Sequence, residues 1–380
     1  GDGNLNLVFI VEGDIGKIII KQALPYVRLV GDSWPLTLER AFFEYNALVR
    51  QEERDSKRVP AIHYFDRTQG LIAMEYLENY KILRGKLIAG ERVSGLSEAL
   101  GKFCARSAFR GSDLFMKAEA KKDDVSLFQK NVELMAITEG LVFTDPYFEA
   151  ERNHHTNGLD EIIKILRNDV RMKANVQHML RKFTSNCETM CHGDLHSGSI
   201  MCTENETRVI DPEFAFYGPL GFDIGMLMSN YLMAFFSQPG HRSDGIELKE
   251  YQDWIIGVIE KTVEVFYQEF RYLWHNERFG ILYPKALFEN QGHDSSEALN
   301  HVLAESWKDA VGICGIEMHR RCLSLAHNAD FEEIDDLKVR AKLEARNLLM
   351  GRELILNAGS LVDVKSISKI AKTYNEKDPF

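Results

Sequence analysis

The periodicity of apolar residues changes along this chain, and the change limits the folds that the chain can adopt. Two short β-rich runs, Leu7 to Val11 and Lys17 to Lys21, flank a glycine turn, and Leu71 to Tyr76 forms another apolar strand pattern. An apolar stripe predicts a helix over Leu36 to Arg50, and helical periodicity dominates from about Ser97 onward. We therefore expect an α+β protein with a small β-rich lobe followed by a large, mainly helical lobe.

Long helices are expected throughout the second part of the chain. The most apolar stretch, Met226 to Phe236, is shorter than the ~18 residues of a membrane span and is interpreted as a buried helix. The charged run from Glu332 to Lys342 is interpreted as the solvated start of a helix. A short β-like stretch, 189–211, carries most of the informative residues. Other helical periods cover Ile162 to Phe183, Tyr251 to Trp274 and Val302 to Leu325.

Composition and charge restrict the partners. The formal net charge is −11 and the basic residues are scattered, whereas a nucleic-acid-binding domain usually carries a basic patch. We expect no nucleic acid and no membrane as partner. The six cysteines form no CxxC pair, which favours buried, reduced thiols and a cytoplasmic location. A zinc site at Cys187, Cys191 and His192 is the alternative, but no second ligand pair accompanies it.

The strongest motif is CHGDLHSGSIM, which contains Asp194, followed seventeen residues later by Asp211 in VIDPE. Two carboxylates at this spacing, each after a β-rich run, match a phosphoryl-transfer site. One carboxylate accepts or orients the attacking hydroxyl, and the other holds Mg²⁺ on the phosphates of ATP. The alternative is that both are turn residues that cap strand ends.

The HGDLH sequence resembles the catalytic loop of aminoglycoside phosphotransferases, choline kinases and their relatives, which share a bilobal protein-kinase-like fold. The resemblance implies that Asp194 is the catalytic base and that ATP and Mg²⁺ are the cofactors. It also implies a nucleotide-binding lobe over residues 1–77 and a catalytic and substrate-binding lobe over residues 78–380.

Two departures from the general kinase pattern restrict the families that this chain can resemble. Ser199 stands where the general pattern has Asn, and Asp211-Pro212-Glu213 replaces Asp-Phe-Gly. Glu213 adds a carboxylate on the side of Asp211, so both are predicted metal ligands. The alternative is that Glu213 pairs with a neighbouring Lys or Arg. HGDLHSGSIM followed by DPEFAFYGPLGFDIG closely resembles the 5-methylthioribose kinases.

The first lobe continues this resemblance. Gly1, Gly3 and Asn4 resemble the nucleotide loop, although such a sequence alone is usually just a turn. Lys21 ends a β-branched run, as the lysine that pairs with the α- and β-phosphates does. Its partner is predicted to be Glu44, with Glu39 as the competitor; both could also be solvated helix charges.

Further residues are assigned to nucleotide and substrate. Glu75, Tyr76 and Leu77 resemble the hinge that hydrogen-bonds adenine, or belong simply to a buried strand. Trp34 is a candidate neighbour of the methylthio group. Asp223 is expected to cap a helix and, by resemblance, to hold the catalytic loop.

The twin arginine Arg320-Arg321 contributes to the substrate site in the family that this chain resembles, together with Asp194. Consecutive helical residues point ~100° apart, so one could reach the site while the other pairs elsewhere. Without the resemblance, both would be interpreted as solvated.

The resemblance implies transfer of the γ-phosphoryl group to the anomeric hydroxyl of 5-methylthioribose, in methionine salvage, by a homodimer. An aminoglycoside or choline kinase is the alternative, but arginines suit a neutral polyol better than a cation. A protein kinase is disfavoured because Asp223 follows Asp211 too closely for an activation loop. A binding module without activity would be expected to lack Lys21, Asp194 or Asp211, and all three are present.

Overall fold

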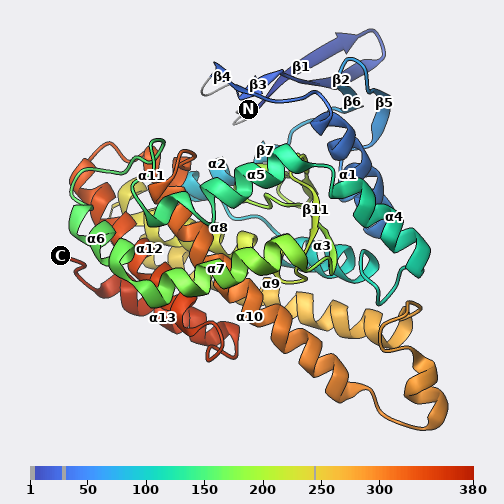
Figure 1. Ribbon diagram of the computed structural model, residues 1–380. Coiled ribbons are helices and arrows are strands. Elements are labelled where there is room, and N and C mark those ends of the chain that lie inside the picture. The colour runs from blue at the N-terminus through green and yellow to red at the C-terminus, as the bar shows by residue number, and fades with distance from the viewer. Residues whose placement is uncertain (1–4, 28–30, 244) are drawn as a thin grey trace.

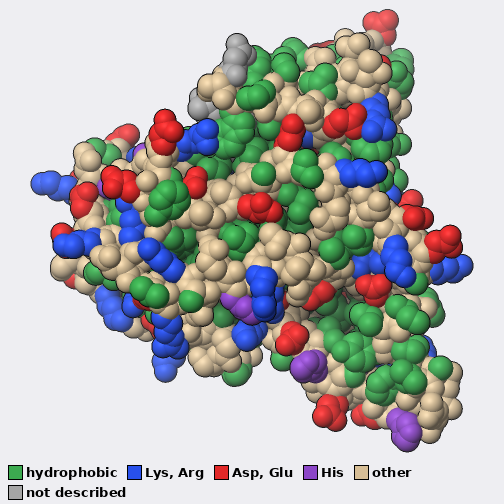
Figure 2. Space-filling view, in the orientation of Figure 1, with side chains coloured by type: hydrophobic (Ala, Val, Ile, Leu, Met, Phe, Trp, Pro, Cys, Tyr) green, Lys and Arg blue, Asp and Glu red, His purple; other side chains and the backbone are tan. Residues whose placement is uncertain are grey.

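The computed structural model describes residues 5–27, 31–243 and 245–380. Figure 1 shows a small sheet lobe, drawn in blue, set on a larger helical body. A hairpin of helices α9 (Ile246–Asn276) and α10 (Ser296–Leu323) projects from this body. The predicted α+β class with two lobes is therefore confirmed. On the face in Figure 2 both signs of charge are interspersed, and exposed apolar side chains gather at the hairpin tip, among them Phe279, Ile281 and Leu287.

The small lobe is built on a four-stranded antiparallel sheet in the order β1-β2-β6-β5. Its strands are β1 (Asn6–Gly13), β2 (Gly16–Ala23), β5 (Ile62–Asp66) and β6 (Leu71–Glu75), and a separate pair joins β3 (Tyr26–Val27) to β4 (Gly31–Pro35). Lys21 lies in the inner strand β2, opposite Val8 in β1 and Ile72 in β6. A side chain on an inner strand is held on both flanks, which fixes its position at the face of the sheet.

Helix α1 (Arg40–Arg54) packs against this sheet. It starts four residues later than predicted, because the chain before it is tied to other elements. The N–H of Leu36 donates to the carbonyl of Pro25 at 3.0 Å, and the N–H of Thr37 donates to the carboxylate of Glu133 at 2.8 Å. Ala41, Glu44 and Leu48 are buried at helical spacing, so Glu44 faces the sheet within an apolar stripe.

The two lobes are joined by the segment after β6. Strand β7 (Lys81–Ile82) leaves the first sheet and pairs with β9 (Ile200–Cys202), which pairs with β10 (Thr207–Val209). The chain therefore passes from the sheet of the small lobe to strands of the large lobe between Glu75 and Lys81. The predicted boundary between residues 77 and 78 falls in this segment, and the assignment of functions to the two parts stays a prediction.

The large lobe is a packed set of helices around α8 (Phe222–His241), whose side chains are buried over most of its length. Helices α9, α10 and α12 pack on it. None of the helices in the described ranges is long and apolar enough to cross a membrane. The other helices are α2 (Leu83–Ala89), α3 (Leu96–Arg110), α4 (Ala118–Phe128), α5 (Val132–Leu141), α6 (Asp160–Asn168), α7 (Val170–Ser185), α9 (Ile246–Asn276), α10 (Ser296–Leu323), α11 (Ala329–Glu332), α12 (Leu337–Asn357) and α13 (Val364–Glu376).

Two expectations about helices are wrong in detail. The period over Ile162 to Phe183 belongs to two helices, because Asp169 ends α6 and accepts the N–H of Met172 at 2.9 Å as the cap of α7. The charged run from Glu332 to Lys342 contains the end of α11 and the start of α12, not a single helix start.

Short strands position the loops that carry the motifs. Strand β8 (Thr189–Cys191) pairs with β11 (Phe216–Gly218). Asp194 lies in the loop after β8, and Asp211 and Glu213 lie in the loop before β11. The pairing therefore brings the bases of the two loops together from separate parts of the sequence.

Candidate active site

Asp223 organises the loop that contains Asp194. Its carboxylate accepts the N–H of His192 at 2.7 Å and the N–H of Gly193 at 3.1 Å. Gly193 has φ +88°, and a Cβ there would lie 2.1 Å from the carbonyl oxygen of Phe214, so only glycine fits. The expected hold on the loop is present. The expected helix cap is not, because both carboxylate oxygens are used on the loop and α8 has no side-chain cap.

Ser199, the first departure from the general kinase pattern, is used by the same loop. Its Oγ accepts the N–H of His196 at 2.9 Å and lies 3.1 Å from the carbonyl oxygen of Asp194, to which it can donate. The side chain is buried. Since the hydroxyl is engaged with the loop backbone, Ser199 supports the shape of the loop and is poorly placed to act as a metal ligand.

Asp194 is held at both oxygens in a set of residues that we call the Asp194 pocket (Asp194, His196, Glu317, Arg320 and Arg321). Its Oδ1 accepts from Arg321 Nη2 at 3.0 Å and from Arg320 Nη1 at 3.4 Å. Its Oδ2 lies 3.2 Å from His196 Nε2. Burial would raise the pKa of Asp194, but the guanidinium charges of Arg321 and Arg320 outweigh burial and hold that pKa well below its ordinary value. The carboxylate is therefore ionised and fixed in orientation.

Glu317 balances the two arginines. Its Oε1 accepts from Arg320 at 2.9 Å and from Arg321 at 2.5 Å, and its side chain is buried. Both arginines thus point into one pocket, whereas we had expected that one could pair elsewhere. The shared partners overcome the ~100° helical offset because guanidinium groups are long and present several donors. With Asp194 included, two carboxylates balance two guanidinium groups.

A second group of acidic residues, which we call the carboxylate cluster, contains Glu44, Asp211 and Glu213. One carboxylate oxygen of each lies within 4.8 Å of the others. The ammonium group of Lys21 donates to Glu44 Oε1 at 2.8 Å and also forms an ion pair with Asp211. The expected contact between Lys21 and Glu44 is therefore present, while the competitor Glu39 pairs with Arg67 at 2.7 Å.

Glu213 also pairs with an arginine, which the sequence analysis gave as the alternative to a role as metal ligand. Its Oε2 accepts from Asn6 Nδ2 at 2.9 Å and lies 3.5 Å from Arg40 Nε. Asn131 holds the backbone of this segment by donating to the carbonyls of Glu213 and Ala215. Glu213 thus belongs to the carboxylate cluster and to a buried ion pair at once, and its predicted role as metal ligand stays a prediction.

Charge and exposure differ within the carboxylate cluster. The side chain of Asp211 is 37% exposed, whereas those of Glu44 and Glu213 are 3% and 5% exposed. Burial would lower the pKa of Lys21, but Asp211 and Glu44 raise it above its ordinary value. Burial raises the pKa of Glu44 and Glu213 despite Lys21. Three carboxylates share two cationic side chains, Lys21 and Arg40, so the cluster would carry excess negative charge only with all three carboxylates ionised.

The backbone of Asp211 has φ +69°, an uncommon conformation for a residue other than glycine. Asp tolerates it better than most residues, and such outliers concentrate at functional sites. At this turn the partly exposed carboxylate of Asp211 pairs with Lys21, while Glu213, two residues later, is buried.

The nucleotide residues predicted in the small lobe are described in part. Gly1, Gly3 and Asn4 lie outside the described residues. Glu75 ends β6, and its N–H already donates to the carbonyl of Ala61 at 2.8 Å. An adenine at this edge would therefore meet Tyr76 and Leu77 rather than the N–H of Glu75. The assignment of Glu75, Tyr76 and Leu77 to adenine stays a prediction.

Trp34 lies in β4, and the guanidinium of Arg152 stacks on its ring at 4.0 Å. It packs on an apolar cluster that Phe214 and Leu325 also contact. Phe214 directly follows Glu213, and Leu325 lies shortly after the twin arginine. Trp34 therefore shares this apolar cluster with residues that lie near Glu213 and the twin arginine in sequence, and its contact with substrate stays a prediction. The cluster consists of Leu5, Leu36, Leu134, Ile137 and Leu141.

The sequence did not identify several residues that complete the site. Glu317 could have been found, since it precedes Arg320 and Arg321 by one helical turn. Asn6, Arg40 and Asn131 carried no comparable signal, because their contacts with Glu213 join segments distant in sequence.

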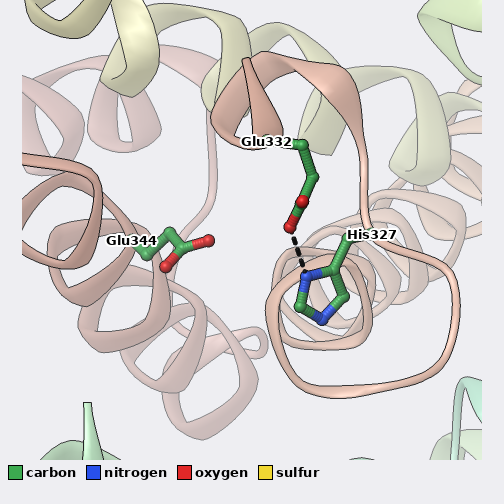
Figure 3. Close-up of side chains that lie close together, drawn as sticks. All are labelled: His327, Glu332 and Glu344. Atoms are coloured by element: carbon green, nitrogen blue, oxygen red, sulfur yellow. Dashed lines mark hydrogen bonds and ion pairs between the residues drawn. The ribbon is translucent and has the colours of Figure 1, made fainter. Parts of the chain in front are cut away.

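Another group of ligand-type side chains lies where α11 and α12 approach the end of α10. His327 Nδ1 lies 2.9 Å from Glu332, with Glu344 beside them (Figure 3). Arg340 forms ion pairs with both carboxylates, at 3.5 Å to Glu344. The guanidinium already balances these charges, so we interpret the group as a structural ion network that joins the helices.

The cysteines of the chain are free, and all except Cys187 are buried. Cys191 Sγ lies near the carbonyl of Pro219, and His192 Nε2 lies 3.0 Å from the carbonyl of Ile210. These contacts point away from a shared metal, which argues against the zinc alternative.

Comparisons with known proteins agree with this geometry. The model of the phosphotransferase enzyme family, APH, matches residues 1–254. The fold and the site thus define a phosphotransferase of this class. The chain is 41% identical to methylthioribose kinase of Escherichia coli O45:K1, over 98% of this chain and 89% of the relative. It is 39% identical to methylthioribose kinase 1 of Oryza sativa subsp. japonica, over 95% of this chain and 86% of the relative. The chain belongs to the methylthioribose kinase family.

The resemblance predicted from the motifs is therefore confirmed. Among solved structures, a glucosamine kinase in complex with glucosamine, ADP and inorganic phosphate is 12% identical, with a TM-score of 0.47. The match covers 91% of this chain and 79% of that one.

Proposed function

We propose that this protein transfers the γ-phosphoryl group of ATP to the anomeric hydroxyl of 5-methylthioribose. The product is 5-methylthioribose 1-phosphate, an intermediate of methionine salvage. The proposal draws its substrate from the methylthioribose kinases that cover nearly the whole chain. The observation that carries it within the site is the pair Arg320 and Arg321 on the carboxylate of Asp194.

The twin arginine separates the candidate substrates. Choline and aminoglycosides are cations, and guanidinium groups offer a cationic group only N–H donors, which it cannot accept. A neutral sugar offers hydroxyl oxygens that accept from the same groups. The geometry therefore favours a polyol over the choline or aminoglycoside alternative.

Asp194 acts on the sugar. Its carboxylate stays ionised because its pKa is held well below the ordinary value, so it accepts a hydrogen bond from the attacking hydroxyl and orients that oxygen. Arg320 and Arg321 supply positive charge where the transferred phosphoryl group develops negative charge. Lys21, held by Glu44, pairs with the α- or β-phosphate of ATP.

The carboxylate cluster fits a divalent cation. Asp211 and Glu213 provide hard oxygen atoms, and together with Glu44 they outnumber the cationic side chains Lys21 and Arg40. When bound there, Mg²⁺ would shield the phosphate charges of ATP. Asp211, whose carboxylate is partly exposed, is the residue best placed to hold it, and Glu213 is proposed as the second ligand.

Location and assembly complete the proposal. Free thiols at all six cysteines are typical of a reducing compartment, which supports a cytoplasmic location. A homodimer is proposed from the family resemblance alone, and light scattering of the purified chain tests it.

A coupled assay of ADP release over a panel of acceptors tests the function. The panel contains 5-methylthioribose, ribose, choline and an aminoglycoside, each with ATP and Mg²⁺. We expect turnover with 5-methylthioribose to exceed the others, with ribose as the matched control for the methylthio group. Preferred turnover of choline or the aminoglycoside would overturn the proposal.

A further inference from the structure

His196, the second histidine of HGDLH, has one ring nitrogen surrounded by donors. Nδ1 lies 2.9 Å from the N–H of Gly198, 3.1 Å from the N–H of Ser199 and 3.4 Å from Arg84 Nη2. Backbone N–H and guanidinium groups only donate. Nδ1 must therefore be the unprotonated nitrogen, and the single ring proton is on Nε2.

The surroundings keep this ring in place. Arg84 is itself anchored, since its Nε lies 3.1 Å from the buried carboxylate of Asp330 and its Nη2 lies 3.4 Å from Asn230 Oδ1. A Cβ at Gly198 would lie 2.7 Å from Cε1 of His196, so the turn closes tightly on the imidazole. Burial lowers the pKa of His196 to about 4, although Asp194 opposes this shift, so the ring is neutral near pH 7.

Nε2, the ring nitrogen that carries the proton, is the one that lies close to Asp194. Nε2 lies 3.2 Å from Oδ2, the oxygen that the arginines do not contact. Arg320 and Arg321 approach only Oδ1, and attraction to them alone would leave the carboxylate free to rotate about its bond to Cβ. A second donor at Oδ2 fixes the plane of the carboxylate.

We infer that His196 is a positioning residue that acts through Asp194. It serves as a neutral donor that holds Oδ2 and thereby fixes the direction in which Asp194 accepts the sugar hydroxyl. The inference rests on the proposed function, in which Asp194 orients that hydroxyl. The competing explanation is that His196 only caps the turn Ser197–Ser199 through Nδ1.

Two substitutions separate the roles of the two nitrogens. His196→Asn keeps an acceptor close to the place of Nδ1, and Asn is a good cap, but it loses the donor at Nε2. His196→Gln places an amide N–H near the position of Nε2. We expect His196→Asn to lower kcat about 10²-fold, the scale for a reacting group misplaced by about 1 Å, with KM for ATP unchanged. We expect His196→Gln to recover a measurable part of that loss.

The decisive comparison repeats His196→Asn in an Asp194→Asn background. If His196 acts through Asp194, the second substitution lowers kcat no further, because residues that act as a unit are not additive. A full additional loss in the double variant would overturn the inference, as would an unchanged kcat in the single Asn variant. Thermal unfolding and ATP binding of each variant verify that the loop remains folded.

Wild-type turnover of 5-methylthioribose is measured first with the same preparation. Its absence contradicts the proposed function. Normal wild-type turnover together with an unaffected Asn variant contradicts the role of His196 alone.

Discussion

The Asp194 pocket and the carboxylate cluster are built in different ways. All residues of the Asp194 pocket come from the large lobe, and their charges are balanced within it. The carboxylate cluster joins Lys21 and Glu44 of the small lobe to Asp211 and Glu213 of the large lobe, and its carboxylates outnumber the cationic side chains that contact them. The difference indicates that the Asp194 pocket is preorganised within one lobe, whereas the carboxylate cluster depends on how both lobes are placed. In the proposed function, the Asp194 pocket is the acceptor side and the carboxylate cluster is the phosphate side.

The largest effect is expected on the acceptor side. Asp194→Asn should lower kcat by at least ~10²-fold, the usual lower scale for a positioned base, while ATP binding is retained because the carboxylate cluster is untouched. Steady-state kinetics and calorimetric ATP titration measure the two quantities. Asp253→Asn, an exposed partner of Lys372, is the matched control. Near-normal turnover of Asp194→Asn would contradict the assignment of Asp194 as the base or hydroxyl-orienting group.

A smaller effect is expected on the phosphate side, where the use of ATP should be impaired and the binding of the sugar should not. Lys21→Met should lower kcat/KM for ATP about 10- to 10²-fold, since a hydrogen bond to a charged group contributes roughly 1.5–3 kcal/mol. KM for the sugar should change little. Lys17→Met on the same strand is the control, because Lys17 pairs with an exposed Glu12. Wild-type ATP saturation in Lys21→Met would remove Lys21 from the nucleotide site.

Glu213→Gln tests whether the buried residue of the cluster reaches the cation. If Glu213 is a metal ligand, loss of its carboxylate should raise the Mg²⁺ concentration for half-maximal rate about tenfold. This is the scale seen when support for a metal site is removed. If Glu213 only pairs with Arg40 and Asn6, the substitution should leave the Mg²⁺ titration unchanged and lower the melting temperature. Glu39→Gln, paired with exposed Arg67, is the control.

The smallest effect concerns His319, which lies on α10 next to the arginines of the Asp194 pocket. His319 precedes the twin arginine, is buried, and lies with Nε2 2.9 Å from the carbonyl of Leu348. Burial lowers the pKa of His319 to about 4, below its ordinary value of about 6.5. Between these values the unfolded chain binds more protons, so the free energy of unfolding rises with pH by at most about 1.4 kcal/mol per pH unit and levels off above the unfolded value.

Urea unfolding of wild type and His319→Gln across this window measures the slope. The slope should be smaller in the variant, and His293→Gln, on the exposed surface, should retain the wild-type slope. Equal slopes in wild type and His319→Gln would show that His319 is not held neutral by the fold.

The sequence predicted the parts of this site that follow from local pattern. Lys21 ends a β-branched run on the inner strand, and Glu44 lies on the apolar stripe of α1, so their contact could be expected. Asp194 and Asp211 stood out by motif spacing, and the family followed from the residues around them. The two-lobe fold followed from the change of periodicity.

The rest depends on contacts that no local pattern records. Arg40 and Asn6 meet Glu213 across the lobes, and the break at Asp169 appears only as a cap within a continuous helical period. Asp223 was expected to cap α8, but the loop N–H groups compete for the same carboxylate and take both oxygens.

The most direct test of the account is the position of the phosphate in the product. The wild-type protein is incubated with ATP, Mg²⁺ and 5-methylthioribose, and the product is analysed by phosphorus and proton NMR. We predict that the phosphate couples to the anomeric proton, as in 5-methylthioribose 1-phosphate, and that Asp194→Asn forms this product at least ~10²-fold more slowly. Phosphate on another hydroxyl, or ADP formed without a phosphorylated sugar, would contradict the account.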